Sequence, residues 1–224
     1  DIGGESSRPG SPPVPLDVER ARVMPVLREA VLLDVPVSVD TYKPEIMREA
    51  LDAGADIVND IWALRWSGDA AGKTGKDVVA AHPSCGVCLM HMQGVPQTMQ
   101  MNPSYADVVA EVKQFLKDRA DACLAVGVVG ERILLDPGFG FGKTTSHNVA
   151  LIQHLDSLKD LGFPLLVGLS RKSVLGSIAG GDEQQRLHAG LAASVISVMK
   201  GAKIVRVHDV KATVDALKVV AAVI

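Results

Sequence analysis

Aromatic residues and cysteines are scarce in this sequence, and long apolar runs are missing from it. Phe, Trp and Tyr make up 4% of the 224 residues, and only three residues are cysteines. An odd and small number of cysteines argues against a disulfide framework and fits a reducing compartment. No apolar run approaches the roughly 18 residues that a membrane-spanning helix needs. We therefore expect a cytoplasmic protein that has no membrane partner.

A strong excess of one charge is also missing. The formal net charge is −3, with 47% hydrophobic and 22% charged residues, which is ordinary for a soluble enzyme. Nothing in this balance indicates a nucleic-acid partner. Cys85 and Cys88 form a C-x-x-C pair, but no second pair completes a zinc site, so we expect them to pack in the core. No linker or repeat divides residues 1–224, and we expect a single domain.

Short apolar segments recur along the chain, and nearly every one ends in a polar residue. Helical segments lie between them, three of which stop at Gly54, Gly127 and Gly201. Strands that alternate with helices predict a parallel α/β sheet, and strands that are apolar throughout are typical of a sheet covered on both faces. The predicted strands are 35–40, 55–60, 86–91, 132–136, 164–172 and 203–208, with a strand tail at 1–2. The predicted helices include 16–31, 44–54, 105–127 and 186–201.

The polar residues at the strand ends decide between two architectures. In an open sheet only the strands at the switch point share a site, whereas in an eight-stranded barrel all carboxyl ends meet at one mouth. Polar endings on nearly every strand favour a (β/α)8 TIM barrel. These endings are Asp40, Asn59, His91, Asp136, Lys172, Arg206 and His208. Seven strands do not close a barrel, and we expect the missing first strand and its following loop to precede Asp1.

The last predicted strand raises the question of a bound anion. In IVRVHDV, residues 204–210, Arg206 and His208 stand two positions apart, which on a strand places both side chains on one face. Cations on a buried face are unfavourable unless an anion meets them. We therefore expect these two residues to bind an anionic ligand.

A glycine-rich segment, DPGFGFGKT (136–144), begins at the last residue of the predicted strand 132–136. It resembles a P-loop, but Pro137, which has no N–H, occupies the first glycine position. A nucleotide site is therefore disfavoured. We expect instead a loop that brings the rings of Phe139 and Phe141 close to a flat ligand.

Acceptor-rich side chains end three of the predicted strands. If a barrel brings Asp40, Asn59 and Asp136 together, two carboxylates and an amide can bind a flat heterocycle with several N–H donors, such as an aminopyrimidinone. Each of these residues alone is more often a cap or a turn residue. The hypothesis therefore depends on their convergence.

Two other segments are candidates for binding anions. In GLSRKS, we expect Ser173 to cap the following helix, whose N-terminus would attract a carboxylate. In DIGGESSRPG, Ser6, Ser7 and Arg8 offer hydroxyl and guanidinium donors to an oxyanion in a loop after a strand.

Seven segments spread over the whole chain share the pattern of one family. They are DIGGESSRPG, SVDTYKP, DIVNDI, CLMHMQGVPQTM, LLDPGFGFGK, GLSRKSVLG and VRVHDV. In this order and spacing they resemble the dihydropteroate synthases of folate biosynthesis, the targets of sulfonamides. The resemblance implies an α/β barrel and a transferase reaction. In it, para-aminobenzoate displaces diphosphate from 6-hydroxymethyl-7,8-dihydropterin diphosphate, with magnesium accompanying the diphosphate.

The resemblance also implies binding residues and an oligomeric state. For the pterin it implies Asp40, Asn59, Met90, Asp136, Phe141, Gly168 and Lys172. For the diphosphate it implies Ser7, Arg8, Arg206 and His208, and for aminobenzoate Ser7, Pro9, Lys172 and Ser173. The catalytic residues would be Asp40, Lys172, Arg206 and His208. No metal ligand is expected in this chain, because the family's asparagine ligand would precede Asp1. We also expect a homodimer formed through the last helices.

Three other functions remain as alternatives. A pterin-dependent methyltransferase domain would keep Asp40, Asn59 and Asp136 but would not need Arg206 and His208. A non-catalytic pterin-binding module would bind pterin without forming product. A P-loop phosphotransferase would bind ATP tightly.

Overall fold

The structure, a computed structural model, describes residues 1–66, 72–182 and 184–223. Its described strands form one parallel sheet in the order β1-β2-β3-β4-β5-β6-β7, which is also their order in the chain. The strands are β1 (Ile2–Gly3), β2 (Ser38–Asp40), β3 (Ile57–Asp60), β4 (Gly86–Met90), β5 (Ile133–Asp136), β6 (Leu165–Val167) and β7 (Ala202–Val205). All seven overlap predicted strands and are parallel, so the parallel α/β prediction is confirmed.

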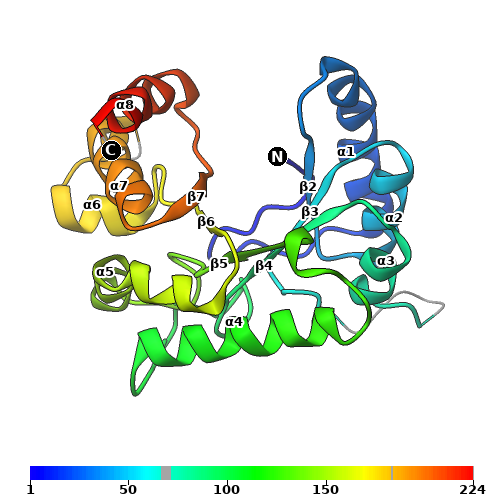
Figure 1. Ribbon diagram of the computed structural model, residues 1–224, viewed down its shortest axis with the longest axis horizontal. Helices are drawn as coiled ribbons and strands as arrows, with labels where there is room; N and C mark the ends of the chain where they lie inside the picture. The colour runs from blue at the N-terminus through cyan, green and yellow to red at the C-terminus, as the bar shows by residue number, and fades with distance from the viewer. Residues whose placement is uncertain (67–71, 183, 224) are drawn as a thin grey trace.

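Helices lie on the outer side of the curled sheet (Figure 1). They are α1 (Leu16–Ala30), α2 (Pro44–Asp52), α3 (Gly75–Ala81), α4 (Val108–Leu124), α5 (Thr145–Gln153), α6 (Ser173–Ala179), α7 (Leu187–Met199) and α8 (Val210–Val223). The predicted stops at Gly54, Gly127 and Gly201 are confirmed, because each has a positive φ of 90° to 106° that suits only glycine well. No described helix is both long and apolar enough to cross a membrane.

The sheet is a barrel that does not close. β1 pairs only with β2 and β7 only with β6 among the described strands, so the opening lies between β7 and β1. An α/β barrel of this kind closes with eight strands. The predicted TIM-barrel architecture, with one strand fewer than a closed barrel, is therefore confirmed.

The cysteines belong to the hydrophobic interior. Cys85, Cys88 and Cys123 are free thiols and at most 1% exposed. Burial raises the pKa of all three, which keeps them as unreactive thiols. Core packing of the C-x-x-C pair is thereby confirmed.

The prediction for the last strand was wrong in two respects. β7 ends at Val205, so Arg206 and His208 lie beyond it. The Arg206 amide still donates to Val167 O, but β6 ends at Val167 and offers no further partner. β7 is also not covered on both faces, because Lys203 and Ile204 are exposed at the open edge of the sheet.

Candidate functional site

A cavity of about 620 Å³ lies at the carboxyl ends of the strands. This is where chemistry takes place in α/β barrels. The predicted site residues that line it are Ser6, Ser7, Arg8, Pro9, Asp40, Phe139, Phe141, Gly168, Lys172, Ser173, Arg206 and His208. They come from the segments after β1, β5, β6 and β7 and from the last residue of β2. The barrel therefore brings together most residues that the sequence proposed.

The three other predicted residues are buried next to the cavity rather than lining it. Asn59, Met90 and Asp136 are 5%, 2% and 3% exposed. Sheet register nevertheless ties them to the cavity, because Asp40 lies opposite Asn59 on β3, and Met90 lies opposite Asp136 on β5. Asp40 and Asn59 thus lie side by side at neighbouring strand ends, while Asp136 lies at the end of β5, with β4 between it and Asn59.

Burial shifts the ionisation of the charged residues in this region. It raises the pKa of Asp40 to about 6, although the nearby Arg206 guanidinium opposes the shift. Burial also raises the pKa of Asp136, with Lys172 opposing. It lowers the pKa of Lys172 to about 8, with Asp136 opposing. The pKa values of Asp40 and Lys172 are thus both moved toward neutrality, and the pKa of Asp136 is raised, as is typical of functional sites.

Arg206 forms a cationic wall of the cavity. Its guanidinium lies against the backbone at Gly168, where an added Cβ would stand 3.3 Å from Arg206 Nη2. Arg206 Nε is 3.8 Å from the Asp1 carboxylate and has no hydrogen-bond partner among the described residues. Asp1 also accepts a hydrogen bond from Asn59 Nδ2 at 3.1 Å. Asp1 therefore connects the acceptor-rich strand ends to the cationic wall.

His208 is held by a residue that the sequence did not single out. Its backbone N–H donates to Ser170 Oγ at 3.2 Å, and its Nδ1 lies 3.1 Å from the same oxygen. Ser170 also lines the cavity. Both Arg206 and His208 line the cavity too, so the expected convergence of the two cations holds although they are not on a strand.

The segment after β6 makes Lys172, and not the predicted Ser173, the N-cap residue of α6. Arg171 has a left-handed backbone (φ 58°) and is fixed by Asp209, which accepts from its Nε and Nη2, and by Arg186 Nη1, which donates to its carbonyl. Because of this bend the N-cap of α6 is Lys172, without a side-chain cap, and Ser173 is already the first helical residue. The prediction that Ser173 caps α6 was therefore wrong.

The glycine-rich segment is not a phosphate loop. Lys143 turns inward, 3% exposed, and its Nζ donates to Gly138 O at 2.9 Å and to Phe141 O at 3.0 Å. Thr144 serves as the N-cap of α5. The lysine and hydroxyl that a P-loop would offer to a nucleotide are thus both used internally.

The two phenylalanines of the glycine-rich segment both border the cavity but pack in different clusters. Phe139 is fully buried in the main hydrophobic core and also borders the cavity, so that a ring contact with a flat ligand stays a prediction. Its carbonyl accepts a hydrogen bond from Lys172 Nζ. Phe141 packs with Met90 in a smaller cluster and lies 4.8 Å from the Lys172 ammonium, in a cation–π arrangement.

Several residues that line the cavity were not found from the sequence. They include Asp1, Glu5, Ser170, Arg171 and Arg186. Arg186 stands just before α7, far along the chain from any strand end, and no sequence pattern marks it. Asp1 and Glu5 could have been found, because they flank the same predicted strand as Ser7 and Arg8.

The residues do not form a metal site of their own. Within residues 1–66, 72–182 and 184–223, no group of three or more His, Cys, Asp or Glu side chains could hold a metal ion.

Comparisons with known proteins agree with this site. The family model described as "Pterin binding enzyme" matches residues 1–208. Dihydropteroate synthase from Neisseria meningitidis serogroup B is 51% identical over 224 residues, which cover 98% of this chain and 76% of that protein. The Yersinia pestis dihydropteroate synthase structure with a sulfonamide drug has a TM-score of 0.93 at 42% identity, covering 98% and 78% of the two chains. The Burkholderia cenocepacia enzyme with 7,8-dihydropteroate has a TM-score of 0.88 at 50% identity, covering 98% and 79%.

An α/β barrel with paired carboxylates at its strand ends and a cationic wall fits an enzyme that handles a pterin and an anion. The chain belongs to the pterin-binding enzyme family and, within it, to the dihydropteroate synthases. The resemblance seen in the seven sequence segments is thereby confirmed.

Proposed function

We propose that this chain catalyses the dihydropteroate synthase reaction with the residues of the 620 Å³ cavity. The observation that carries the proposal is the pairing of two chemistries in one cavity. Asp40, with Asn59 beside it and Asp136 at the end of β5, would provide acceptors for a pterin ring, while Arg206 and His208 would provide donors for a diphosphate.

The reaction separates charge, and the cavity is charged accordingly. The C–O bond to the diphosphate breaks, the leaving group keeps the electron pair, and the pterin methylene becomes positive. Asp40 and Asp136 would stabilise this positive charge through the ring nitrogens. Arg206 and His208, with Ser7 and Arg8, would stabilise the departing anion. Preorganised donors aimed at a developing charge usually lower the activation barrier more than any other single effect.

The arylamine then forms the new C–N bond. Its nitrogen attacks the methylene and afterwards loses a proton to solvent. Because an arylamine is already neutral near pH 7, no strong general base is required, and we assign no covalent nucleophile. Lys172, held between the Phe139 carbonyl and the Phe141 ring, would keep pterin and aminobenzoate in contact.

Magnesium would enter as part of the substrate. The described residues hold no cluster of metal ligands, so the ion would arrive bound to the diphosphate and neutralise part of its charge. No step in this mechanism depends on its position.

The expected assembly is a homodimer in the cytoplasm. Large apolar side chains are exposed on the last two helices, namely Ile196, Met199, Val214 and Val219. Covering them in a second copy would remove apolar surface from water. Light scattering after gel filtration would test the dimer.

A diphosphate-release assay on the full-length protein tests the proposed function. With pterin diphosphate, para-aminobenzoate and magnesium, we expect release that depends on all three. Arg206→Ala should lower turnover by about 100-fold or more, because charge-assisted hydrogen bonds contribute about 1.5–3 kcal/mol each. Pterin binding should persist in that variant. Arg20→Ala, which removes a surface ion pair with Glu49, is the matched control.

Other outcomes would support the alternatives. Pterin binding without diphosphate release would indicate a non-catalytic module, and methyl transfer would indicate the methyltransferase class. Normal turnover in Arg206→Ala would contradict the role given to the cationic wall.

A further inference from the structure

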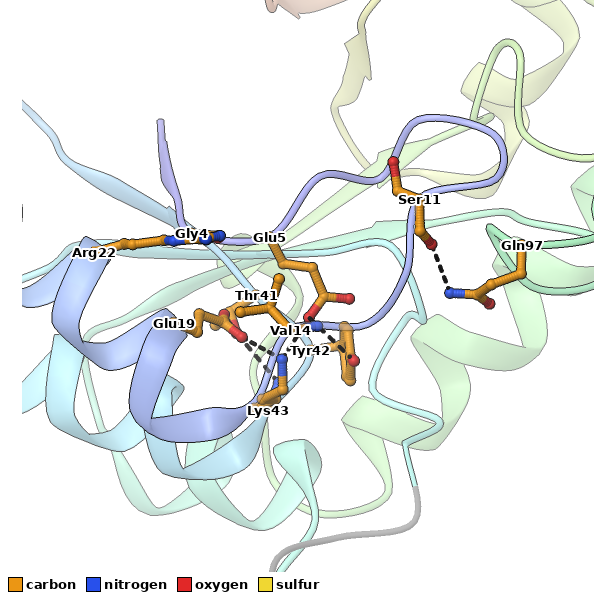
Figure 2. Close-up of polar contacts among 10 residues, drawn as sticks. All are labelled: Gly4, Glu5, Ser11, Val14, Glu19, Arg22, Thr41, Tyr42, Lys43 and Gln97. Atoms are coloured by element: carbon orange, nitrogen blue, oxygen red, sulfur yellow. Dashed lines mark hydrogen bonds and ion pairs between the residues drawn. The ribbon is translucent and has the colours of Figure 1, made fainter.

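The loop that carries Ser7, Arg8 and Pro9 depends on side chains for its shape. Residues 5–14 connect β1 to the start of α1 without helix or strand of their own. The two ends of this loop are joined by one side chain, because the Val14 amide donates to Glu5 Oε2 at 3.0 Å (Figure 2). Glu5 therefore ties the start of the loop to its end.

Glu5 is in turn held by Lys43, which follows β2. Lys43 Nζ lies 2.6 Å from Glu5 Oε2 and also donates to the Glu19 carboxylate of α1 (Figure 2). The side chains of Lys43, Glu5 and Glu19 are only 12%, 13% and 1% exposed. An ion pair so shielded is screened little by solvent and is strongly directional.

Neighbouring groups complete this arrangement. Glu19 accepts from Thr41 Oγ1 at 2.6 Å, and Tyr42 OH donates to Glu5 at 3.3 Å. Burial alone would lower the pKa of Lys43, but its hydrogen bonds to Glu19 and Glu5 outweigh burial and raise it. Lys43 is therefore a permanent cation, and it joins the loop to β2 and α1 at once.

The far side of the loop is fixed more weakly. Gln97 Nε2 donates to Ser11 O at 2.9 Å, and the Gly10 amide donates to Pro96 O at 3.0 Å (Figure 2 shows the first). Both are single neutral hydrogen bonds, which contribute about half as much as charge-assisted ones. The contact of Lys43 with Glu5, in contrast, joins two full charges in a shielded position.

We propose that Lys43 is a positioning residue for the aminobenzoate and diphosphate contacts made by Ser7, Arg8 and Pro9. It acts through Glu5 and does not itself line the cavity. The inference rests on the proposed function and extends it to a residue away from the reacting atoms. The pterin side of the cavity, built on β2, β3 and β5, does not depend on the loop.

Two variants of the full-length enzyme test the inference. Lys43→Met leaves two shielded carboxylates unpaired and could unfold the protein. Lys43→Met combined with Glu19→Gln removes one of those charges, which preserves the fold while Glu5 stays unanchored. Lys117→Met, which removes an exposed helical ion pair with Asp121, is the control.

We expect the double variant to raise the KM for para-aminobenzoate at least tenfold. The Kd for 6-hydroxymethyl-7,8-dihydropterin, which lacks the diphosphate and reports on the pterin side alone, should stay within twofold of the parent value when it is measured by calorimetry. Lys43→Arg should restore most of the KM, because it keeps the charge. Hydrogen exchange at the Val14 amide should also become at least tenfold faster, because its acceptor Glu5 has been released.

An unchanged KM and unchanged Val14 exchange in the folded double variant would overturn the inference. Equal increases in the aminobenzoate KM and the pterin Kd would also overturn it, since they would indicate general loosening. An inactive parent enzyme would instead contradict the proposed function, and Val14 exchange would still decide the role of Lys43.

Discussion

Two loops border the cavity, and they are held in place by different means. The loop 5–14 is fixed by an ion pair between Lys43 and two carboxylates. The loop 137–143 is fixed by close backbone packing and by Lys143. In the first, the anchor is a side-chain network that other side chains could replace. In the second, the backbone itself has no room to move.

The two anchoring lysines show the same contrast in their ionisation. Carboxylates raise the pKa of Lys43, whereas burial lowers the pKa of Lys143 well below its usual value. Lys143 has carbonyl partners and His91 Nδ1, at 2.8 Å, instead of a paired carboxylate. The loop 5–14 is therefore held by an ion pair, and the loop 137–143 is held mainly by close backbone packing.

The largest expected effect comes from adding one methyl group to each loop. Gly138 and Gly10 have similar positive φ values of 67° and 80°. A Cβ at Gly138 would stand 1.8 Å from His91 O, whereas a Cβ at Gly10 would meet nothing within 4 Å. We expect Gly138→Ala to lower the free energy of unfolding by roughly 3–5 kcal/mol and Gly10→Ala by about 1 kcal/mol. Urea denaturation measures both.

Equal destabilisation by the two substitutions would show that φ, and not packing, limits both loops. The loop 137–143 would then not be held by closer packing than the loop 5–14. A folded Gly138→Ala variant with normal turnover would contradict the tight packing of the loop 137–143.

A smaller effect is expected from acid. Burial, with help from Lys143 and Arg65, lowers the pKa of His91 to about 2, far below its usual value near 6.5. Below pH 6.5 the unfolded chain therefore binds a proton that the folded protein does not, and stability falls as pH falls, by about 1.4 kcal/mol per unit. Between pH 7 and pH 5 we expect His91→Gln to lose about 2 kcal/mol less than the parent.

Thermal unfolding at the two pH values measures this difference, and the exposed His154→Gln is the control. Hydrogen exchange would show which loop loosens first as the pH falls. Acid should loosen the loop 137–143, which contacts His91 through Lys143, before the loop 5–14. The opposite order would contradict the assignment of anchors.

The smallest expected effect concerns discrimination between ligands by the loop 5–14. Thr at position 7 would keep the hydroxyl of Ser7 and add one methyl group on the side that the family resemblance implies for aminobenzoate. One buried methyl contributes about 0.8 kcal/mol, or roughly fourfold in affinity. We expect Ser7→Thr to change the ratio of the sulfonamide inhibition constant to the aminobenzoate KM by about that factor. An unchanged ratio would remove the idea.

The sequence was sufficient to predict the sheet and most of the site. Strand positions followed from apolar runs that end in polar residues, and the barrel then brings Asp40, Lys172 and Arg206 to one cavity. These are local signals combined with one topological rule. The exact end of β7 was not predictable, because it depends on β6 stopping at Val167.

The remaining errors and omissions have non-local causes. Ser173 failed as a cap because the left-handed bend at Arg171 moves the start of α6. Lys43 was missed because its partners lie 38 and 24 residues away along the chain. The buried location of the Phe139 ring likewise depends on packing that no short pattern records.

The charge of the cavity has a consequence for how quickly substrates arrive. Its cationic lining residues are Arg8, Arg171, Lys172, Arg186 and Arg206, and its carboxylates are Asp1, Glu5 and Asp40. The protein as a whole carries a net charge of −3. Anions are thus repelled weakly by most of the surface and drawn to one mouth, where the field is concentrated. Diffusion of a diphosphate or a carboxylate would be guided toward productive encounters, and the rate of association would fall as salt is added.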